Sequence, residues 1–163
     1  MKPSIRTWLL LTAALLTTLS CESEVREANI NQNKYIDDYI QLRYSDNEIV
    51  RNDGVVRVIL VDTLKSVPAI EPGDSAFLFI AGYTFGQNGP VNEFMLDTAT
   101  VRIGKGDLIV GLDKGLVGAH LGEESLILFP SKYGYGRNTV GMVPENTALM
   151  FNVAVAAIKK NKY

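Results

Sequence analysis

The chain has very few of the residues that most enzymes use for chemistry. It has 163 residues with one cysteine, Cys21, and one histidine, His120. A single thiol excludes an internal disulfide, and one histidine with no second soft ligand cannot assemble a zinc site. The balance of 16 basic and 18 acidic residues gives no electrostatic case for nucleic acid. We therefore expect no metal and no cofactor, and chemistry that depends on shape and apolar surroundings.

The first 20 residues have the pattern of a secretory signal. Lys2 and Arg6 precede an apolar, threonine-rich core, which ends at Ser20 before Cys21. The core is too short for an ordinary membrane span. A cysteine directly after a small residue indicates a bacterial lipoprotein signal, with Cys21 as the lipidated N-terminus. We therefore expect a protein anchored by lipid in the cell envelope, at the periplasmic or surface face of the outer membrane. A plain secreted protein with one unpaired thiol is the alternative.

The mature chain is expected to fall into three parts after the signal peptide of residues 1–20. Residues 21–33 are polar and acidic and predict a lipidated tether. Residues 34–53 predict a helical extension, because apolar side chains recur there at spacings of three and four: Tyr35, Ile36, Tyr39, Ile40 and Leu42. Residues 54–163 predict one folded domain.

That domain is predicted to be of the α+β class, a twisted antiparallel β-sheet wrapped around one short α-helix. Asp107 is a plausible N-cap for this helix. The segment from Gly82 to Asp97 reads as a loop, because Gly86, Asn88, Gly89 and Pro90 interrupt any regular period. The expected strands are Val55 to Val61, Ala76 to Ala81, Thr100 to Ile103, Ser125 to Phe129 and Thr147 to Ile158.

The most specific motif lies near the C-terminus. Tyr133-Gly134-Tyr135-Gly136 is followed, after a short gap, by Gly141-Met142-Val143-Pro144-Glu145-Asn146. The pattern is typical of a flap that carries rings and aliphatic side chains over an apolar site. With Leu108-Ile109, Gly111-Leu112 and Leu126 to Pro130, it resembles the FKBP-type peptidyl-prolyl cis-trans isomerases. The similarity covers roughly residues 70 to 158. Relatives of this kind include bacterial lipoproteins, among them gliding-motility-associated isomerases.

The resemblance implies an apolar pocket that twists X–Pro bonds, and it implies a role for each matching residue. Tyr135 would donate its hydroxyl to the substrate carbonyl, and Ile109 its backbone N–H. Leu112 would form the floor, and Met142 would lie at the rim. The walls would be Leu108, Ile109, Val143 and Phe151.

The other half of the pocket departs from the family pattern. Ile80 stands where the family usually has a tyrosine. For a phenylalanine–aspartate pair, Phe94 with Met95 keeps the ring, whereas Leu96 with Asp97 keeps the acid. We name Asp97 as the candidate acid and Ile80 and Phe94 as candidate substrate contacts.

Three functional hypotheses follow. The first is an envelope prolyl isomerase that acts as a monomer on proline-containing unfolded or exported proteins and is open to macrolide inhibitors. The second is a catalytically weak or inactive chaperone or binding module in a motility or secretion assembly. The third sets the resemblance aside and describes a lipid-anchored, β-rich ligand-binding or structural domain.

Overall fold

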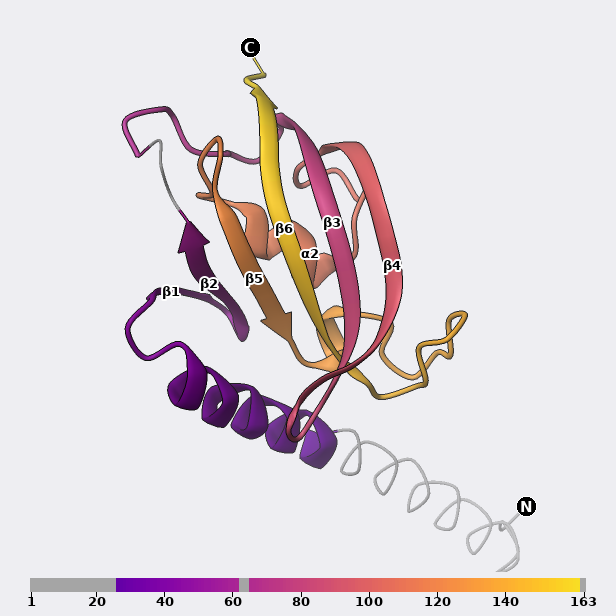
Figure 1. Ribbon diagram of the computed structural model, residues 1–163. Helices are drawn as coiled ribbons and strands as arrows, with labels where there is room; N and C mark the ends of the chain where they lie inside the picture. Colours follow the sequence, from indigo (N-terminus) through magenta and orange to yellow (C-terminus); the bar gives the residue numbers. More distant parts are fainter. Residues whose placement is uncertain (1–25, 62–64, 162–163) are drawn as a thin grey trace, which may run out of the picture.

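The protein folds around one six-stranded antiparallel sheet, seen in a computed structural model that describes residues 26–61 and 65–161. The strand order is β1-β2-β5-β6-β3-β4, and the short helix α2 (Val110–Leu116) lies against one face (Figure 1). This confirms the predicted α+β class. The strands are β1 (Glu48–Asn52), β2 (Val55–Val61), β3 (Ser75–Gly86), β4 (Gly89–Arg102), β5 (Glu124–Phe129) and β6 (Ala148–Lys159).

The two faces of the sheet carry different clusters of apolar side chains. On β3, Leu78 and Ile80 are buried on the face that packs against α2, which we call the inner face, whereas Phe77 and Phe79 point to the outer face and are exposed. This is the period of two that a strand imposes. The inner cluster contains the larger rings and aliphatic side chains of β5 and β6, namely Ile127, Phe129, Leu149, Phe151, Val153 and Val155.

An N-terminal helix, described over residues 26–43, covers one end of the outer face. Ile36, Tyr39 and Ile40 are buried, and they pack against side chains of β2, β5 and β6. The amphipathic helix predicted from Lys34 to Leu42 is therefore confirmed, but the predicted helical extension of residues 34–53 ends at residue 43, and strand β1 follows it. Two other details of the prediction were wrong. Residues 26–33, predicted as part of the tether, are helical, and Leu42 faces away from the sheet and is 81% exposed.

Those two errors have simple causes. At 3.6 residues per turn, Leu42 lies about 200° around the helix from the buried Ile40, so it points away from the sheet. The polar composition of residues 26–33 concealed a helix whose buried contacts are hydrogen bonds and not apolar packing. Cys21 and the rest of residues 1–25 lie outside the described part of the chain.

The predicted loop from Gly82 to Asp97 was also wrong. It belongs to a long hairpin in which β3 and β4 are joined by the two residues between Gly86 and Gly89. Gly89 has φ +123°, and a Cβ atom there would lie 2.8 Å from the ring of Tyr39 on the N-terminal helix. Pro90 is tolerated because β4 is an edge strand, where a missing N–H costs little. The glycines mark a tight turn and not a loop.

Helix α2 begins without the predicted Asp107 cap. Its N-cap is Ile109, which has extended backbone angles and makes no side-chain capping bond. The carboxylate of Asp107 instead accepts hydrogen bonds from the backbone N–H and the guanidinium of Arg102. Within residues 26–61 and 65–161, no helix is both long enough and apolar enough to cross a membrane.

Candidate active site

Three aromatic rings from three different segments meet at the inner face of the sheet. Phe94 of β4 contacts Tyr135 of the loop between β5 and β6 at 6.4 Å between ring centroids, and Phe151 of β6 at 5.7 Å, both edge to face. Phe151 in turn stacks on Phe129 of β5 at 5.8 Å. Edge-to-face and offset contacts at these distances are the favourable geometries for aromatic pairs.

Gly82 of β3 makes room for this ring cluster. A Cβ atom at that position would lie 2.8 Å from Phe151 and 2.9 Å from Phe94, closer than side-chain atoms approach. The sequence therefore needs glycine there, because two rings occupy the space that a side chain would fill.

Aliphatic side chains complete the walls around the rings. Ile80, Leu112 and Val143 are 4%, 2% and 1% exposed and belong to the same inner cluster. Leu108 and Ile109, which precede α2, are half-buried against it. The structure thus brings together the predicted floor, the predicted walls and both residues of the divergent half, Ile80 and Phe94.

Two glycines let α2 approach the sheet closely enough to form the floor. A Cβ atom at Gly111 would lie 2.4 Å from the ring of Phe129, and one at Gly115 would lie 2.3 Å from Ile127. The two positions are four residues apart and therefore face the same side of the helix. Leu112 follows Gly111, and this close packing places it in the inner cluster beneath the rings.

A buried ion pair fastens the other end of α2. Arg57 of β2 donates to the carbonyl groups of Gly115 and Val117 at 2.8 and 2.9 Å, and its Nε lies 3.2 Å from Glu123. A cation at a helix C-terminus interacts favourably with the helix dipole. Glu123 also accepts a hydrogen bond from the N–H of His120, so the lone histidine belongs to the turn that holds this glutamate.

Tyr135 presents its hydroxyl from a half-buried position. Burial raises the pKa of Tyr135 above its usual value. The phenol therefore stays protonated at neutral pH and can donate a hydrogen bond to a carbonyl oxygen. Ile109 precedes the first turn of α2, where N–H groups have no partner within the helix. Its backbone N–H is thus of the kind that remains available to a ligand.

The other flap residues have different surroundings. Tyr133 packs against the β1–β2 turn, where a Cβ atom at Gly54 would lie 3.1 Å from its ring, and it does not join the ring cluster. Met142 is 68% exposed in a tight turn that Val140 and Val143 close by exchanging backbone hydrogen bonds. Val143 is buried in the inner cluster, whereas Met142 is exposed.

Asp97 is the predicted site residue that fits this arrangement least well. It lies opposite Ile80 in the β3–β4 register, so the pleat directs both side chains toward the inner face. Asp97 is nevertheless exposed, and its carboxylate accepts a hydrogen bond of 2.7 Å from the N–H of Thr98.

A register shift between Met95 and Glu93 leaves Phe94 as an extra residue in β4, and this bulge turns its ring into the cluster.

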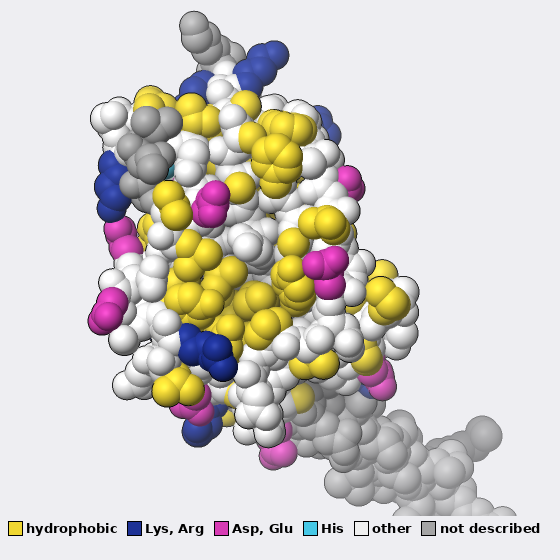
Figure 2. Space-filling view, viewed as in Figure 1, with side chains coloured by type: hydrophobic (Ala, Val, Ile, Leu, Met, Phe, Trp, Pro, Cys, Tyr) yellow, Lys and Arg dark blue, Asp and Glu magenta, His cyan; other side chains and the backbone are white. Residues whose placement is uncertain are grey.

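Sequence reasoning missed Phe129, which forms the base of the ring stack at the end of β5. Its position at the end of an apolar strand, directly before Pro130, could have marked it as a candidate site residue. A hollow of about 590 Å³ lies on the outer face. Its lining includes Phe79, Ala81, Leu96, Thr98, Asn152 and Ala154, together with the predicted site residues Ile80 and Asp97. Figure 2 shows hydrophobic side chains gathered on this face.

Comparison with known proteins decides the family. The family model for FKBP-type peptidyl-prolyl cis-trans isomerases matches residues 69–156, more than half of the chain. The chain belongs to this family. The matched range includes the ring cluster, helix α2 and the flap. In the described ranges no group of three histidine, cysteine, aspartate or glutamate side chains is placed to hold a metal ion.

Individual FKBP proteins show the same relationship. FK506-binding protein 1B of Aspergillus fumigatus is 33% identical over 100 residues, which cover 55% of this chain and 82% of that protein. FK506-binding protein 1 of Aspergillus oryzae is 40% identical over 58 residues, which cover 36% of this chain and 50% of that protein. The crystal structure of FkpA from Escherichia coli superposes with a TM-score of 0.62 at 18% identity, over 97% of this chain and 74% of that one. At that identity the superposition establishes the fold alone.

Proposed function

We propose that this chain is a prolyl isomerase that binds proline-containing segments in the ring cluster and twists their X–Pro bonds. The observation that carries the proposal is the contact of Tyr135 with Phe94, inside walls formed by Ile80, Leu112 and Val143. Rings and aliphatic side chains suit a pyrrolidine ring, and Tyr135 supplies a neutral donor. None of these groups has to change its protonation state during the reaction.

The chemistry requires little more than this. Rotation about a peptide bond has a barrier of about 18–20 kcal/mol, so lowering it by about 5 kcal/mol would accelerate the step a few thousandfold. Water stabilises the planar amide, which is the more charge-separated form. An apolar pocket removes part of that stabilisation, while the twisted amide loses less. A hydrogen bond from Tyr135 can then hold the carbonyl in place during rotation.

A protease-coupled assay with proline tetrapeptides tests this proposal. The test variant is Tyr135→Phe combined with Phe94→Leu, which removes the donor and one ring without emptying the buried floor. We expect the wild-type chain to exceed this variant at least about tenfold in kcat/KM, the change expected from losing about 1.4 kcal/mol of transition-state binding. Equal turnover by both proteins would reject the proposal. Inhibition by FK506, which the names of several relatives specify, would locate activity in the same pocket.

Binding of unfolded clients without rapid catalysis is the second candidate function. It is favoured by the exposed, locally bonded Asp97 and by the exposed apolar tip of the flap at Val140 and Met142. In this case the chain should suppress aggregation of an unfolded client at stoichiometric ratios, and the double pocket variant should do so equally well. A client that aggregates at the same rate with and without the chain would exclude this role.

We also propose that the domain is tethered in the cell envelope through lipid on Cys21. The support is the signal pattern of residues 1–20 and the position of the only cysteine. Expression in a Gram-negative host should place the wild-type chain in the membrane fraction with incorporated palmitate, whereas Cys21→Ser should lose both. Recovery of the wild-type chain from the soluble fraction without bound lipid would contradict the anchor.

A further inference from the structure

Gln32, on the N-terminal helix, bonds to both ends of the flap, defined here as residues 130–147 between β5 and β6. Its side-chain Nε2 donates to the carbonyl of Asn146 at 2.6 Å. The backbone N–H of Ser131 donates to its Oε1 at 2.7 Å. Gln32 is only 5% exposed, so both hydrogen bonds lie away from solvent. One side chain therefore spans the beginning and the end of the flap.

The two residues that Gln32 joins also hold the residue after Tyr135. The N–H of Gly136 donates to the carbonyl of Ser131 at 2.9 Å, and the N–H of Asn146 donates to the carbonyl of Gly136 at 2.6 Å. The N–H and the carbonyl of Gly136 are thus hydrogen-bonded to Ser131 and Asn146, the two residues to which Gln32 also bonds. This continuous hydrogen-bond network leads from the helix to the peptide that carries the flap tyrosine.

A second helix residue strengthens the same contact. Asn29 lies one turn before Gln32 and therefore on the same side of the helix. Its Oδ1 accepts hydrogen bonds from the hydroxyl of Ser131 at 3.2 Å and from the N–H of Lys132 at 3.3 Å. The ribbon shows this end of the helix at the same end of the molecule as the flap (Figure 1). At one end of the helix, the side-chain amides of Asn29 and Gln32 hydrogen-bond to the flap. Farther along the helix, Ile36 and Ile40 pack against the sheet.

We propose that Gln32 is a positioning residue, through which docking of the N-terminal helix sets the place of Tyr135 in the pocket. The inference rests on the proposed isomerase function, and it adds a partner for the site from outside the family-matched range of residues 69–156. Gln32 does not touch the substrate. It acts through Ser131, Asn146 and Gly136, so the helix that leads to the membrane-proximal part of the chain also determines the geometry of the pocket.

Two substitutions separate the two hydrogen bonds. Gln32→Leu keeps a helix-forming side chain of similar size and removes both bonds. Gln32→Glu keeps the acceptor for Ser131 and loses the donor to Asn146. Hydrogen exchange is measured on the full chain, together with isomerase kinetics. In Gln32→Leu we expect exchange at Ser131, Gly136 and Asn146 to rise about tenfold or more relative to β6, because local opening governs exchange. In Gln32→Glu, Ser131 should remain protected.

The kinetic signature should be a loss in kcat of about tenfold in Gln32→Leu with KM changed less than about twofold, because the apolar walls remain and only the donor is misplaced. Two controls lie on the same helix. Lys34→Ala removes an exposed ion pair with Asp38 and should keep wild-type kcat and wild-type exchange in the flap. Ile40→Ala loosens the packing of the helix on the sheet and reports general destabilisation. It should raise exchange in the flap clearly less than Gln32→Leu does, because Gln32 still bonds to Ser131 and Asn146.

Wild-type exchange in the flap of folded Gln32→Leu would overturn the proposal, and so would an equal rise in Ile40→Ala. If the wild-type chain has no isomerase activity, the proposed function fails on that result alone. The exchange data still decide whether Gln32 positions the flap, and the affinity for a proline tetrapeptide then replaces kcat as the second readout, with weaker binding expected in Gln32→Leu.

Discussion

The hydroxyl of Tyr135 is the side-chain donor that the flap brings to the ring cluster, and its removal is the most direct test at the scale of one residue. In Tyr135→Phe the ring contact with Phe94 remains and the proposed hydrogen bond to the substrate carbonyl is lost. A neutral hydrogen bond contributes about 1–1.5 kcal/mol, so we expect kcat/KM to fall about tenfold. The measurement is the protease-coupled assay. Tyr133→Phe is the matched control, because Tyr133 packs on the β1–β2 turn.

The pH profile of the wild-type chain follows from the same residue. Burial raises the pKa of Tyr135, so its hydroxyl keeps its proton to a higher pH than an exposed tyrosine does. Activity should therefore be constant from neutral pH up to about pH 9 and decline only as the pH rises past the usual tyrosine value of about 10. A decline between pH 7 and 9 that Tyr135→Phe does not share would show that this phenol ionises early, which contradicts the assignment.

The sequence could single out side chains whose neighbours along the chain mark them. Leu112 and Val143 follow recognisable glycine and methionine positions, and the structure buries both. The sequence alone could not decide between Phe94 and Asp97 as site residues, because the direction of each side chain depends on a register shift between β3 and β4. A one-residue bulge reverses which side chains face the core, and nothing local in the sequence marks it.

At the scale of one element, close packing of α2 on β5 places Leu112, the proposed floor of the pocket. Gly115→Ala places a Cβ atom 2.3 Å from Ile127, a clash that the helix or the sheet must relieve by moving. Alanine favours a helix over glycine by about 1 kcal/mol. Overpacking costs about 1–3 kcal/mol, so we expect a net loss of up to about 2 kcal/mol in the free energy of unfolding. Urea denaturation measures it.

The double variant Gly115→Ala with Ile127→Ala tests the cause. Ile127→Ala alone should be destabilising by about 2–5 kcal/mol, because it leaves a cavity. If the clash is the cause, the new methyl group partly fills that cavity, and the double variant is more stable than the sum of the single variants predicts. Strict additivity would mean that Gly115 matters through backbone conformation and not through packing.

Elements were predictable where a periodic apolar pattern marks them. The alternation in β3 and the helical spacing from Tyr35 to Ile40 both correspond to buried faces. The β3–β4 hairpin escaped prediction because glycine, asparagine and proline punctuate loops and tight turns alike. The contacts of Gln32 escaped because its partners are 99 and 114 residues away. No local pattern in the sequence reports contacts over that distance.

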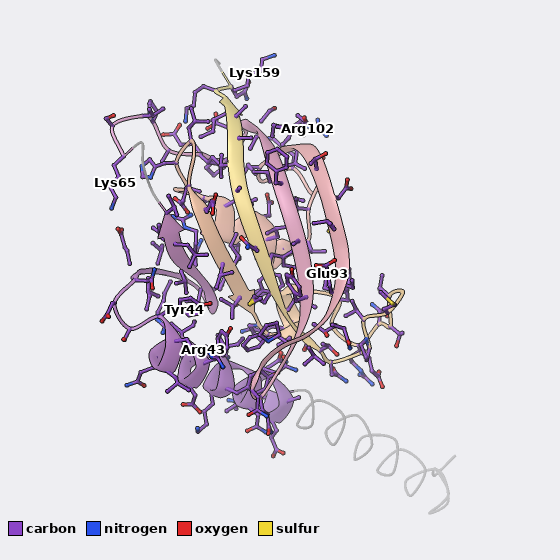
Figure 3. All side chains as sticks on the ribbon, in the orientation of Figure 1. Arg43, Tyr44, Lys65, Glu93, Arg102 and Lys159 are labelled. Carbon is purple, nitrogen blue, oxygen red and sulfur yellow. The ribbon has the colours of Figure 1, made fainter. Side chains whose placement is uncertain are left out.

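At the scale of the whole molecule, the sheet is held at two opposite ends. The N-terminal helix crosses one end, with Arg43 and Tyr44 near its close, and Arg102 and Lys159 lie at the other (Figure 3). At that far end Asp74 joins two segments of the chain. Its carboxylate accepts hydrogen bonds from Lys160 at 2.7 Å, from the N–H of Asn161 at 2.9 Å and from the N–H of Glu71 at 2.8 Å. It fastens the end of β6 to the start of β3.

Asp74→Asn should therefore weaken the whole fold in a way that depends on pH. Burial raises the pKa of Asp74, but the hydrogen bonds from Lys160, Asn161 and Glu71 together bring it below the usual value. A carboxyl group whose pKa is lower in the folded state stabilises the fold above its unfolded value of 3.8, and that contribution is lost as the pH falls through the folded pKa. At pH 7 we expect a loss of about 2 kcal/mol, typical of hydrogen bonds to a buried charge.

Urea titrations of wild type and Asp74→Asn at a series of pH values check this expectation. The difference in unfolding free energy should be largest near neutral pH and should shrink below about pH 4, as the wild-type carboxylate takes up its proton. Asp38→Asn makes the same change in net charge at an exposed ion pair and should leave the unfolding curve unchanged. A difference between wild type and Asp74→Asn that persists undiminished at pH 2 would show that amide and carboxylate differ there in packing and not in charge, and the proposed ionic fastening of the two chain segments would be wrong.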